Sequence, residues 1–284
     1  MERVSAGKLN LCQIKGMNQM IKQLFLDMDG TLLNRQGQVS AENARVLKSC
    51  GIPVTLVSAR APMEMRSAIQ ALDLKTPQIA FNGGLVFQPQ GAPLTAQPLA
   101  QRTSRRLLQL LKTAFPTVSL SYYTADHWYT AQIDRGIKAE MAINDWEPTL
   151  STAISEQPIF KIMLIVFEPQ VMLKLQATLQ ALHLTDVSIQ QSGTLYLELT
   201  SHLAKKSAGI AQIKRQRQLK TTEMAAFGDG HNDLPMLQAV GTPIVMGNAL
   251  PAIQAAGKFV TKTNDEDGVA YGVTHFIGAV GARK

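Results

Sequence analysis

Residues 23–31 read Gln-Leu-Phe-Leu-Asp-Met-Asp-Gly-Thr, and this stretch decides the fold. The apolar run 23–26 is typical of a buried strand, and Asp29-Gly30 is a turn signal directly after it. Asp27 and Asp29 would then lie at the carboxyl end of the strand. Such an acidic stretch is by itself often only a turn, so its meaning depends on the rest of the chain.

Strand and helix patterns alternate on both sides of a long middle segment. The predicted elements lie over residues 23–26, 41–50, 53–57, 62–72, 78–81, 207–218, 224–227 and 243–246, with further helices after Asp233 and at the C-terminus. This alternation is typical of a parallel sheet with crossover helices. We therefore expect a Rossmann-like, doubly wound α/β core.

The pattern changes between about residues 89 and 195. Helical patterns over 99–115 and 169–183 are mixed there with strand patterns over 118–123, 128–131, 160–167, 187–190 and 194–199. We interpret this segment as an inserted α+β cap domain. The expected organisation is an N-terminal extension over 1–20, a core over 21–86 and 197–284, and a cap over 87–196.

Composition narrows the class of protein. The chain has 284 residues, 45% of them hydrophobic, which is enough for a large core. Its two cysteines are too few for a disulfide framework, and no cysteine and histidine cluster indicates zinc. The apolar run 162–167 is far shorter than the ~20 residues of a membrane helix. We expect a cytoplasmic protein without a membrane partner.

The net charge of +7 is compatible with an anionic partner. Basic residues concentrate over 102–112 and 205–220, and we expect both stretches to be solvated helix faces. Aromatic residues do not interleave with the second stretch, so a base-stacking platform is not supported. The charge alone does not choose between small phosphorylated metabolites and nucleic acid, and we expect no nucleic-acid partner.

Several polar residues directly follow predicted strands. They are Asp27, Asp29, Ser58, Asn82 and the loop 228–233, which reads Gly-Asp-Gly-His-Asn-Asp. In an open parallel sheet, ligands bind beyond the carboxyl ends of the strands. The carboxylates of two separate segments would meet there, and a divalent cation would offset their repulsion. Ligands that offer only oxygen favour Mg²⁺.

These motifs carry a resemblance to a known family. Asp27-Met-Asp-Gly-Thr31 resembles the first motif of the haloacid dehalogenase-like (HAD) superfamily, and Gly228–Asp233 resembles its fourth. The segments 241–249 and 263–269 resemble the Cof-type subgroup of sugar- and cofactor-phosphate phosphatases. The resemblance covers roughly residues 21–86 and 197–280.

The resemblance implies a role for each aspartate. Asp27 would attack phosphorus and form an aspartyl-phosphate. Asp29 would protonate the leaving oxygen and later deprotonate water, while its backbone carbonyl helps hold Mg²⁺. Asp27 and Asp229 would bind the metal directly, and Asp233 through water. A carboxylate nucleophile with a neighbouring acid and base is sound chemistry for such a displacement.

The resemblance also implies donors for the phosphoryl group. They are the Met28 amide, the Ser58 hydroxyl, the Ala59 backbone and Asn232, together with a lysine. Such donors stabilise the charge that develops during phosphoryl transfer. The second motif departs from the family because Ala59 replaces the usual glycine, which would strain a turn with φ > 0.

Two lysines could fill the lysine position of the family pattern. That pattern places an aliphatic residue four positions after the lysine. Lys206 is followed by Ile210, whereas Lys205 is followed by Gly209, so we prefer Lys206. Ser207 stands where glycine is common in this motif.

The expected function is Mg²⁺-dependent hydrolysis of a small phosphorylated metabolite, such as a sugar phosphate or a flavin or pyridoxal phosphate. Two alternatives remain open. A sugar phosphomutase of the same superfamily would share the motifs. A phospho-accepting receiver module would share the sheet and the aspartates, but the Asp27 and Asp29 spacing and the ~100-residue insertion disfavour it.

Overall fold

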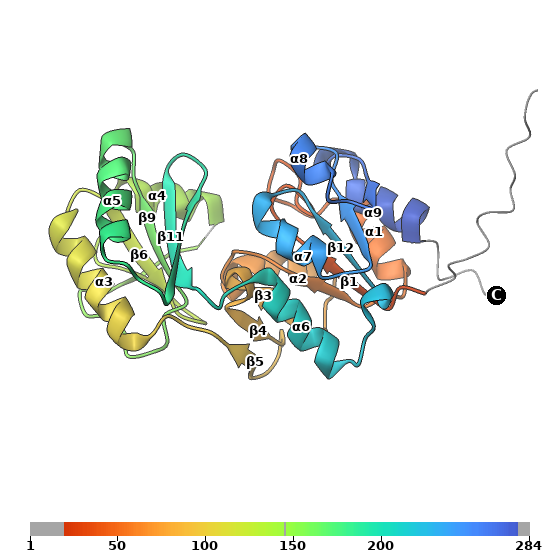
Figure 1. The fold of residues 1–284 in the computed structure, drawn as a ribbon, viewed down its shortest axis with the longest axis horizontal. Helices are drawn as coiled ribbons and strands as arrows, with labels where there is room; N and C mark the ends of the chain where they lie inside the picture. Colours follow the sequence, from red (N-terminus) through yellow and green to blue (C-terminus); the bar gives the residue numbers. More distant parts are fainter. Residues whose placement is uncertain (1–19, 145, 278–284) are drawn as a thin grey trace, which may run out of the picture.

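The computed structural model describes residues 20–144 and 146–277. They form a core and a cap that lie side by side (Figure 1). The predicted extension over 1–20 lies outside the described residues except for Met20, and so does the C-terminal stretch 278–284.

The core is built on a parallel sheet with the strand order β14-β13-β12-β1-β2. The strands are β1 (Gln23–Leu26), β2 (Val54–Leu56), β12 (Met224–Gly228), β13 (Thr242–Val245) and β14 (Phe259–Val260). β1 pairs in parallel with β2 and with β12. The strand that precedes Asp27 therefore lies between a strand of the first third of the chain and one of the last.

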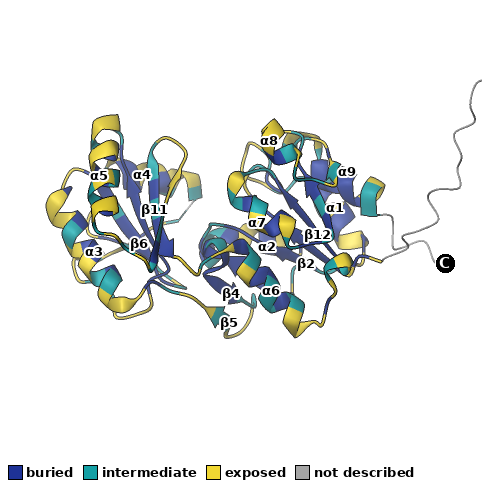
Figure 2. Ribbon diagram, in the orientation of Figure 1, coloured by how far each residue is buried: buried dark blue, intermediate teal, exposed yellow. Residues whose placement is uncertain are grey.

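Helices cover both faces of this sheet (Figure 2). One face packs against α1 (Ala41–Ser49), α2 (Arg66–Ala71) and α9 (Gly268–Gly272), and the other against α6 (Lys206–Gln216), α7 (Leu234–Gln238) and α8 (Pro251–Gln254). Successive side chains of a strand point to opposite faces. Leu24 and Leu26 accordingly join one hydrophobic cluster and Phe25 joins the other. The doubly wound α/β architecture is confirmed.

The predicted strand over 78–81 differs from expectation. β3 (Gln78–Ala80) meets the segment after β2 through a parallel bridge between Val57 and Ile79, and pairs along its length with an antiparallel strand. β3, β4 (Leu85–Phe87) and β5 (Pro93–Ala96) form a separate antiparallel sheet. The chain reverses there because Phe81, Asn82 and Gly83 all have positive φ.

The cap contains a second sheet with the order β10-β11-β9-β6-β7-β8. Its strands are β6 (Ser119–Tyr123), β7 (Trp128–Thr130), β8 (Thr149–Leu150), β9 (Lys161–Ile165), β10 (Val187–Ser192) and β11 (Tyr196–Ser201). Helices α3 (Gln101–Ala114) and α5 (Pro169–Ala181) pack on one face through a hydrophobic cluster. This α+β cap agrees with the fold class expected for the insertion.

The pairing of β11 carries the cap sheet to Ser201, past residue 196, where the sequence placed the end of the insertion. The alternation of side chains continues through 197–201 without a glycine or proline to end the strand. β5 in turn stays in the sheet of β3 and β4, so residues 93–96 lie with the core rather than with the cap sheet.

Aromatic side chains join the cap to the core. Phe81 of the core stacks on Phe160 of the cap at a centroid distance of 5.2 Å and meets Tyr123 edge-on at 6.5 Å. Arg66 of α2 lies over the ring of Trp146 at 5.4 Å. The cap is therefore packed against the core on the side of β3.

The lack of a side chain at Gly83 lets the turn after β3 lie close to the backbone that precedes α6. Gly83 has a φ of +98°, and a Cβ at this position would lie 2.1 Å from the carbonyl oxygen of Lys205. We expect Gly83→Ala to lower the free energy of unfolding by roughly 3 kcal/mol or more, because backbone atoms must move as well as φ. Urea denaturation measures the loss.

Gly193 provides the matched control. It also has a positive φ, +72°, but nothing lies within 4 Å of its Cβ position. Gly193→Ala should cost only the left-handed backbone strain, about 1–2 kcal/mol. Equal losses in the two variants would show that close packing at Gly83 is unimportant.

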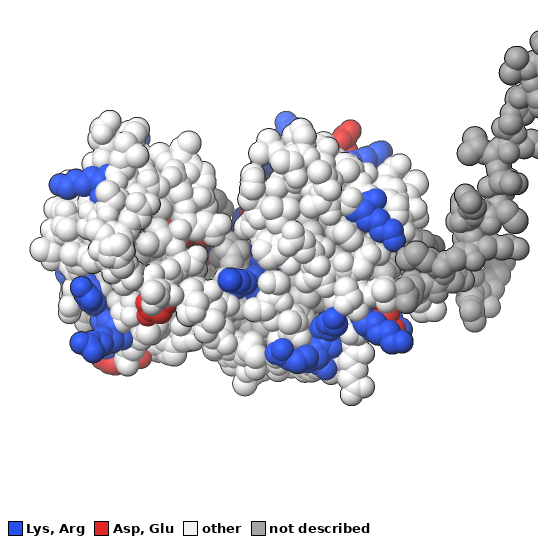
Figure 3. Space-filling model, viewed as in Figure 1, with Lys and Arg blue, Asp and Glu red and all other residues white. Residues whose placement is uncertain are grey.

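The basic stretches lie on the surface of α3 and α6, and blue side chains are spread over both parts in Figure 3. Arg102 and Arg106 of α3 and Arg215 of α6 are exposed, as expected for solvated helix faces. Lys206 is the exception and is buried. Within residues 20–144 and 146–277, we find no helix long and apolar enough to span a bilayer.

Candidate active site

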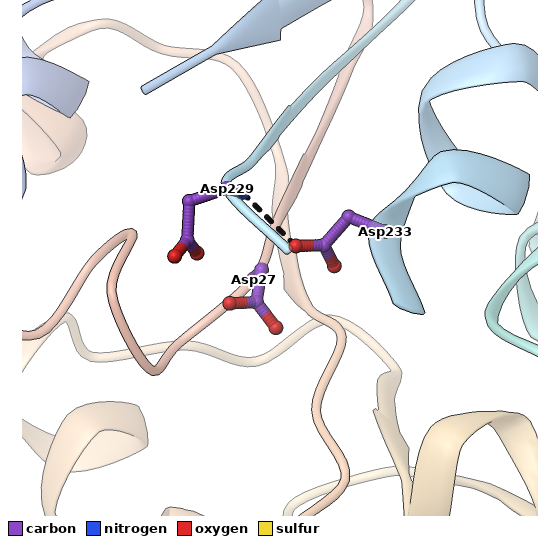
Figure 4. Close-up of side chains that lie close together, drawn as sticks. All are labelled: Asp27, Asp229 and Asp233. Atoms are coloured by element: carbon purple, nitrogen blue, oxygen red, sulfur yellow. Dashed lines mark hydrogen bonds between the residues drawn. The ribbon is translucent and has the colours of Figure 1, made fainter. Parts of the chain in front are cut away.

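Asp27 and Asp229 follow adjacent parallel strands. Leu26 of β1 pairs with Phe227 of β12, and the Asp27 amide donates to the Phe227 carbonyl at 3.0 Å. The two loops therefore leave the sheet at the same edge. Asp233, at the start of α7, completes the group, and Figure 4 shows the three carboxylates close together. One potential ligand atom from each lies within 4.8 Å of the others.

Lys206, the first residue of α6, is inserted between two of these aspartates. Its Nζ donates to Asp27 Oδ1 and to Asp233 Oδ1, the latter at 2.7 Å. Burial opposes its charge, but the two carboxylates outweigh burial and raise the pKa of Lys206 above its ordinary value. Lys205 is exposed. Lys206 is thus the lysine that reaches the predicted nucleophile.

Asp233 holds the loop after β12 in place, in addition to its contact with Lys206. Its Oδ2 accepts hydrogen bonds from the amides of Asp229, at 3.0 Å, and Gly230, at 2.9 Å. Gly228 permits this approach, since a Cβ there would lie 2.6 Å from the Cβ of Asp233. The side chain is fully buried. Both of its oxygens already have donors, so it is suited to positioning its neighbours.

Crowding and burial disfavour negative charge at this site. Burial raises the pKa of Asp27 well above its usual value, the charge of Asp233 adds to the rise, and Lys206 opposes it. Burial likewise raises the pKa of Asp229, against a hydrogen bond from the Thr31 hydroxyl at 2.8 Å. Oxygen ligands with a surplus of negative charge fit a hard divalent cation.

The carboxylate of Asp29 does not join this group. Its side chain is 57% exposed and is held by the guanidinium of Arg60, with Nη2 to Oδ1 at 2.7 Å and Nε to Oδ2 at 2.9 Å. Arg60 belongs to the loop after β2, next to Ser58 and Ala59. Asp29 therefore lies at the exposed side of the site.

The expected phosphate donors lie around the same edge. Ser58 is buried, and its Oγ accepts from the Arg60 amide at 3.1 Å. Met28 is buried after β1, and Asn232 is half-buried in the loop after β12. Ala59 is absent from the described residues with positive φ, so alanine is not strained at this position.

Sequence reasoning gave no role to Asn248. Its Nδ2 donates to the Gly30 carbonyl at 2.9 Å and lies 3.5 Å from Asp229 Oδ2, while its Oδ1 accepts from the Asn264 amide at 3.1 Å. It therefore links the loops after β1, β12 and β14. The sequence could have pointed to Asn248, because it closely follows the predicted strand 243–246 and so lies at the same edge of the sheet. Asp267, which follows Asn264 closely in the chain, does not reach the aspartate group. Its carboxylate accepts a hydrogen bond from the Ser40 hydroxyl and so joins the start of α9 to the start of α1.

A cluster of aspartates and one lysine at the carboxyl edge of a parallel sheet, beside an inserted cap, defines a capped α/β protein with its ligand site at the strand ends. The chain belongs to the haloacid dehalogenase-like hydrolase family, whose model matches residues 24–273. The predicted Cof-type resemblance is thereby confirmed.

Named relatives agree with this assignment. Phosphatase YwpJ of Bacillus subtilis is 27% identical, over 90% of this chain and 100% of its own length. The 5-amino-6-(5-phospho-D-ribitylamino)uracil phosphatase YwtE of the same organism is 26% identical, over 90% and 98%. A haloacid dehalogenase-like hydrolase from Bacteroides thetaiotaomicron shares the fold, with a TM-score of 0.82, 24% identity and coverage of 88% and 97%. The protein is a phosphatase of this family.

Proposed function

We propose that the protein is a Mg²⁺-dependent phosphatase that removes phosphate from a small phosphorylated metabolite through an aspartyl-phosphate at Asp27. The observation that carries this proposal is the hydrogen-bonded group of Asp27, Lys206 and Asp233 beside Asp229. A carboxylate held by a buried lysine cannot turn away from the site. From its position at the sheet edge, Asp27 would face a phosphate group bound there.

In the first step, a carboxylate oxygen of Asp27 attacks phosphorus, and the bond to the leaving oxygen breaks as Asp29 gives that oxygen its proton. In the second step, Asp29 takes a proton from water, and the resulting hydroxide attacks phosphorus and releases phosphate from Asp27. Lys206 and the donors of Met28, Ser58, Ala59 and Asn232 stabilise the phosphoryl oxygens.

Asp27, Asp229 and the backbone carbonyl of Asp29 would hold Mg²⁺, with Asp233 reaching it through water. When bound, the ion offsets the negative charge of both the aspartates and the phosphate. Arg60 would keep the carboxylate of Asp29 at the leaving-group side through the hydrogen bonds of its Nε and Nη2.

Hydrolysis of p-nitrophenyl phosphate by the purified protein tests the proposal. We expect turnover with Mg²⁺, loss of turnover with EDTA, and free phosphate as the product. No turnover with any divalent cation would refute the proposed function. Product analysis with a hexose 1-phosphate separates the mutase alternative, since a mutase would return an isomerised ester.

Asp229→Asn should raise the Mg²⁺ concentration for half-maximal activity by at least about 10-fold, because it removes a charged oxygen ligand, and loss of even an outer-shell partner costs this much. Metal titration at fixed substrate measures this shift. Asp265→Asn is the control, since Asp265 is an exposed aspartate that pairs with Arg35 instead. An unchanged titration in Asp229→Asn would remove Asp229 from the metal site.

The proposed class of substrate is supported by the name of a relative and by the net charge of +7, which suits an anionic substrate. The name of YwtE gives a phosphorylated ribityl compound as its substrate. We propose a compound of this size range, a phosphorylated small metabolite, for this chain as well. The cytoplasmic location and the absence of a nucleic-acid partner stay predictions.

A further inference from the structure

One face of the cap sheet combines apolar residues of the core cluster with polar residues that the proposed chemistry does not use. Residues opposite each other in an antiparallel sheet share a face, and the pairs Lys161 with Thr200 and Met163 with Glu198 align β9 and β11. Neighbouring residues such as Ile162 and Leu199 face α3 and α5 on the other side. Lys161 and Glu198 therefore belong to the face without α3 and α5.

This face is directed toward the core. Lys161 Nζ lies 3.5 Å from the carbonyl oxygen of Ala59, and Tyr123, opposite Lys161 on β6, meets Phe81 of the core. Ala59 precedes Arg60, which holds Asp29. The Lys161 end of the cap face thus adjoins the loop that holds the proposed proton donor to the leaving group.

Lys161 has few partners for a buried cation. It is 4% exposed, and among the described residues no carboxylate lies within 4.0 Å of its Nζ. Its neighbours are the long contact to Ala59 and the ring of Tyr123 at 4.5 Å. An ammonium carries three donors, so most of its hydrogen-bonding capacity is unused.

Glu198 supplies free hydrogen-bond acceptors beside the donors of Lys161. It is half-buried, and none of the described residues donates a hydrogen bond to its carboxylate. Glu140 and Asn144 of α4 (Arg135–Asn144) lie nearby in the same polar region, joined by a hydrogen bond of 2.7 Å. Burial raises the pKa of the Tyr196 phenol of β11 to about 12, and both glutamates add to the rise. The cap face thus presents an unused donor and an unused acceptor together.

The charges around this face are unequal. Burial opposes the charge of Lys161, but Glu198, Glu64 and Glu140 raise its pKa despite burial and the charge of Arg60. Arg60, the other cation, is engaged by Asp29. Three carboxylates therefore act on one ammonium that has no ion pair among the described residues, and a second anionic group on a ligand would be repelled.

We infer that Glu198 and Lys161 determine specificity by binding an uncharged, hydroxyl-bearing leaving group and rejecting one with a second anionic group. A hydroxyl donates to Glu198 and accepts from Lys161, so it satisfies both residues. The inference rests on the proposed phosphatase activity and names the chemistry of its leaving group.

The test compares two matched probes, fructose 6-phosphate and fructose 1,6-bisphosphate, by phosphate release, with p-nitrophenyl phosphate as reference. The quantity measured is the ratio of kcat/KM for the monophosphate to that for the bisphosphate. We expect a ratio of at least about tenfold in the wild type, as for a few well-placed polar contacts.

Two variants should move this ratio in opposite directions. Glu198→Gln removes a repulsive charge and should lower the ratio at least about fivefold, mainly through KM. Lys161→Met removes the attractive charge and should raise it. A purely structural role would not produce opposite shifts. Glu168→Gln, the same change at an exposed site where α5 begins, is the control and should leave the ratio unchanged.

The inference would be overturned if the wild type preferred the bisphosphate, or if neither variant changed the ratio. The proposed function would still stand in that case, provided that the wild type hydrolyses p-nitrophenyl phosphate. If the wild type hydrolysed none of the three probes, the proposed function would be refuted, and the inference with it.

Discussion

Asp27→Asn is expected to lower kcat by at least about 10⁴-fold, because an amide cannot replace the attacking carboxylate and nucleophile removal in other covalent enzymes costs this much. The measurement is p-nitrophenyl phosphate turnover at saturating Mg²⁺. Lys206 and Asp233 remain paired in the variant, so the site should stay assembled. Activity within tenfold of the wild type would assign the nucleophile to another residue.

The same substitution should not destabilise the metal-free protein near neutral pH. The pKa of Asp27 is raised in the folded state, chiefly by burial and then by Asp233. A carboxyl whose pKa rises on folding favours the folded state at low pH, and this contribution is lost as the pH rises from the unfolded pKa through the folded one. Urea denaturation in EDTA at pH 7 should therefore show Asp27→Asn at least as stable as the wild type. A clear loss of stability would contradict this sign.

Lys206→Met should damage both activity and stability. It leaves two buried carboxylates, Asp27 and Asp233, without their shared cation. Breaking a buried ion pair from one side costs roughly 3–5 kcal/mol. Turnover should fall as well, because the donor beside Asp27 is lost. Denaturation in EDTA and turnover in Mg²⁺ measure the two effects separately.

Lys205→Met is the matched control, since Lys205 is the preceding residue and is exposed. It should change the free energy of unfolding by less than about 0.5 kcal/mol, as is usual for surface substitutions. Similar losses in both variants would mean that the region responds to any change at the start of α6. A larger loss in Lys205→Met would reverse the assignment of the site lysine.

Much of the fold could be predicted because its signals are local. The buried strand before Asp27 and the strand before Asp229 each carried apolar residues and a turn signal, and parallel pairing then required their loops to meet. Lys206 could be chosen over Lys205 because its spacing to Ile210 matches the lysine pattern of the resembled family, and Ile210 is buried against the sheet. The two strands follow from local pattern, whereas the choice of lysine also needed the resemblance.

The remaining features depend on partners far away in the chain. The direction of the Asp29 side chain is set by Arg60, which lies on another loop. Asn248 acquires its role only when three loops meet. The end of the cap sheet at Ser201 is fixed by pairing with β9 and β10 rather than by a turn residue. Tertiary contacts, not local preference, decide such positions.

The central place of β1 has a consequence for synthesis on the ribosome. Asp27 and Lys206 are 179 residues apart, and β12, which pairs with β1, lies still later in the chain. The cap, with a hydrophobic cluster of its own, is complete in the emerging polypeptide before β12 appears. A nascent chain can therefore assemble this cluster of the cap ahead of an unfinished core. The repulsive meeting of the aspartates is postponed to the last stage of translation, when Lys206 is already present to neutralise part of it.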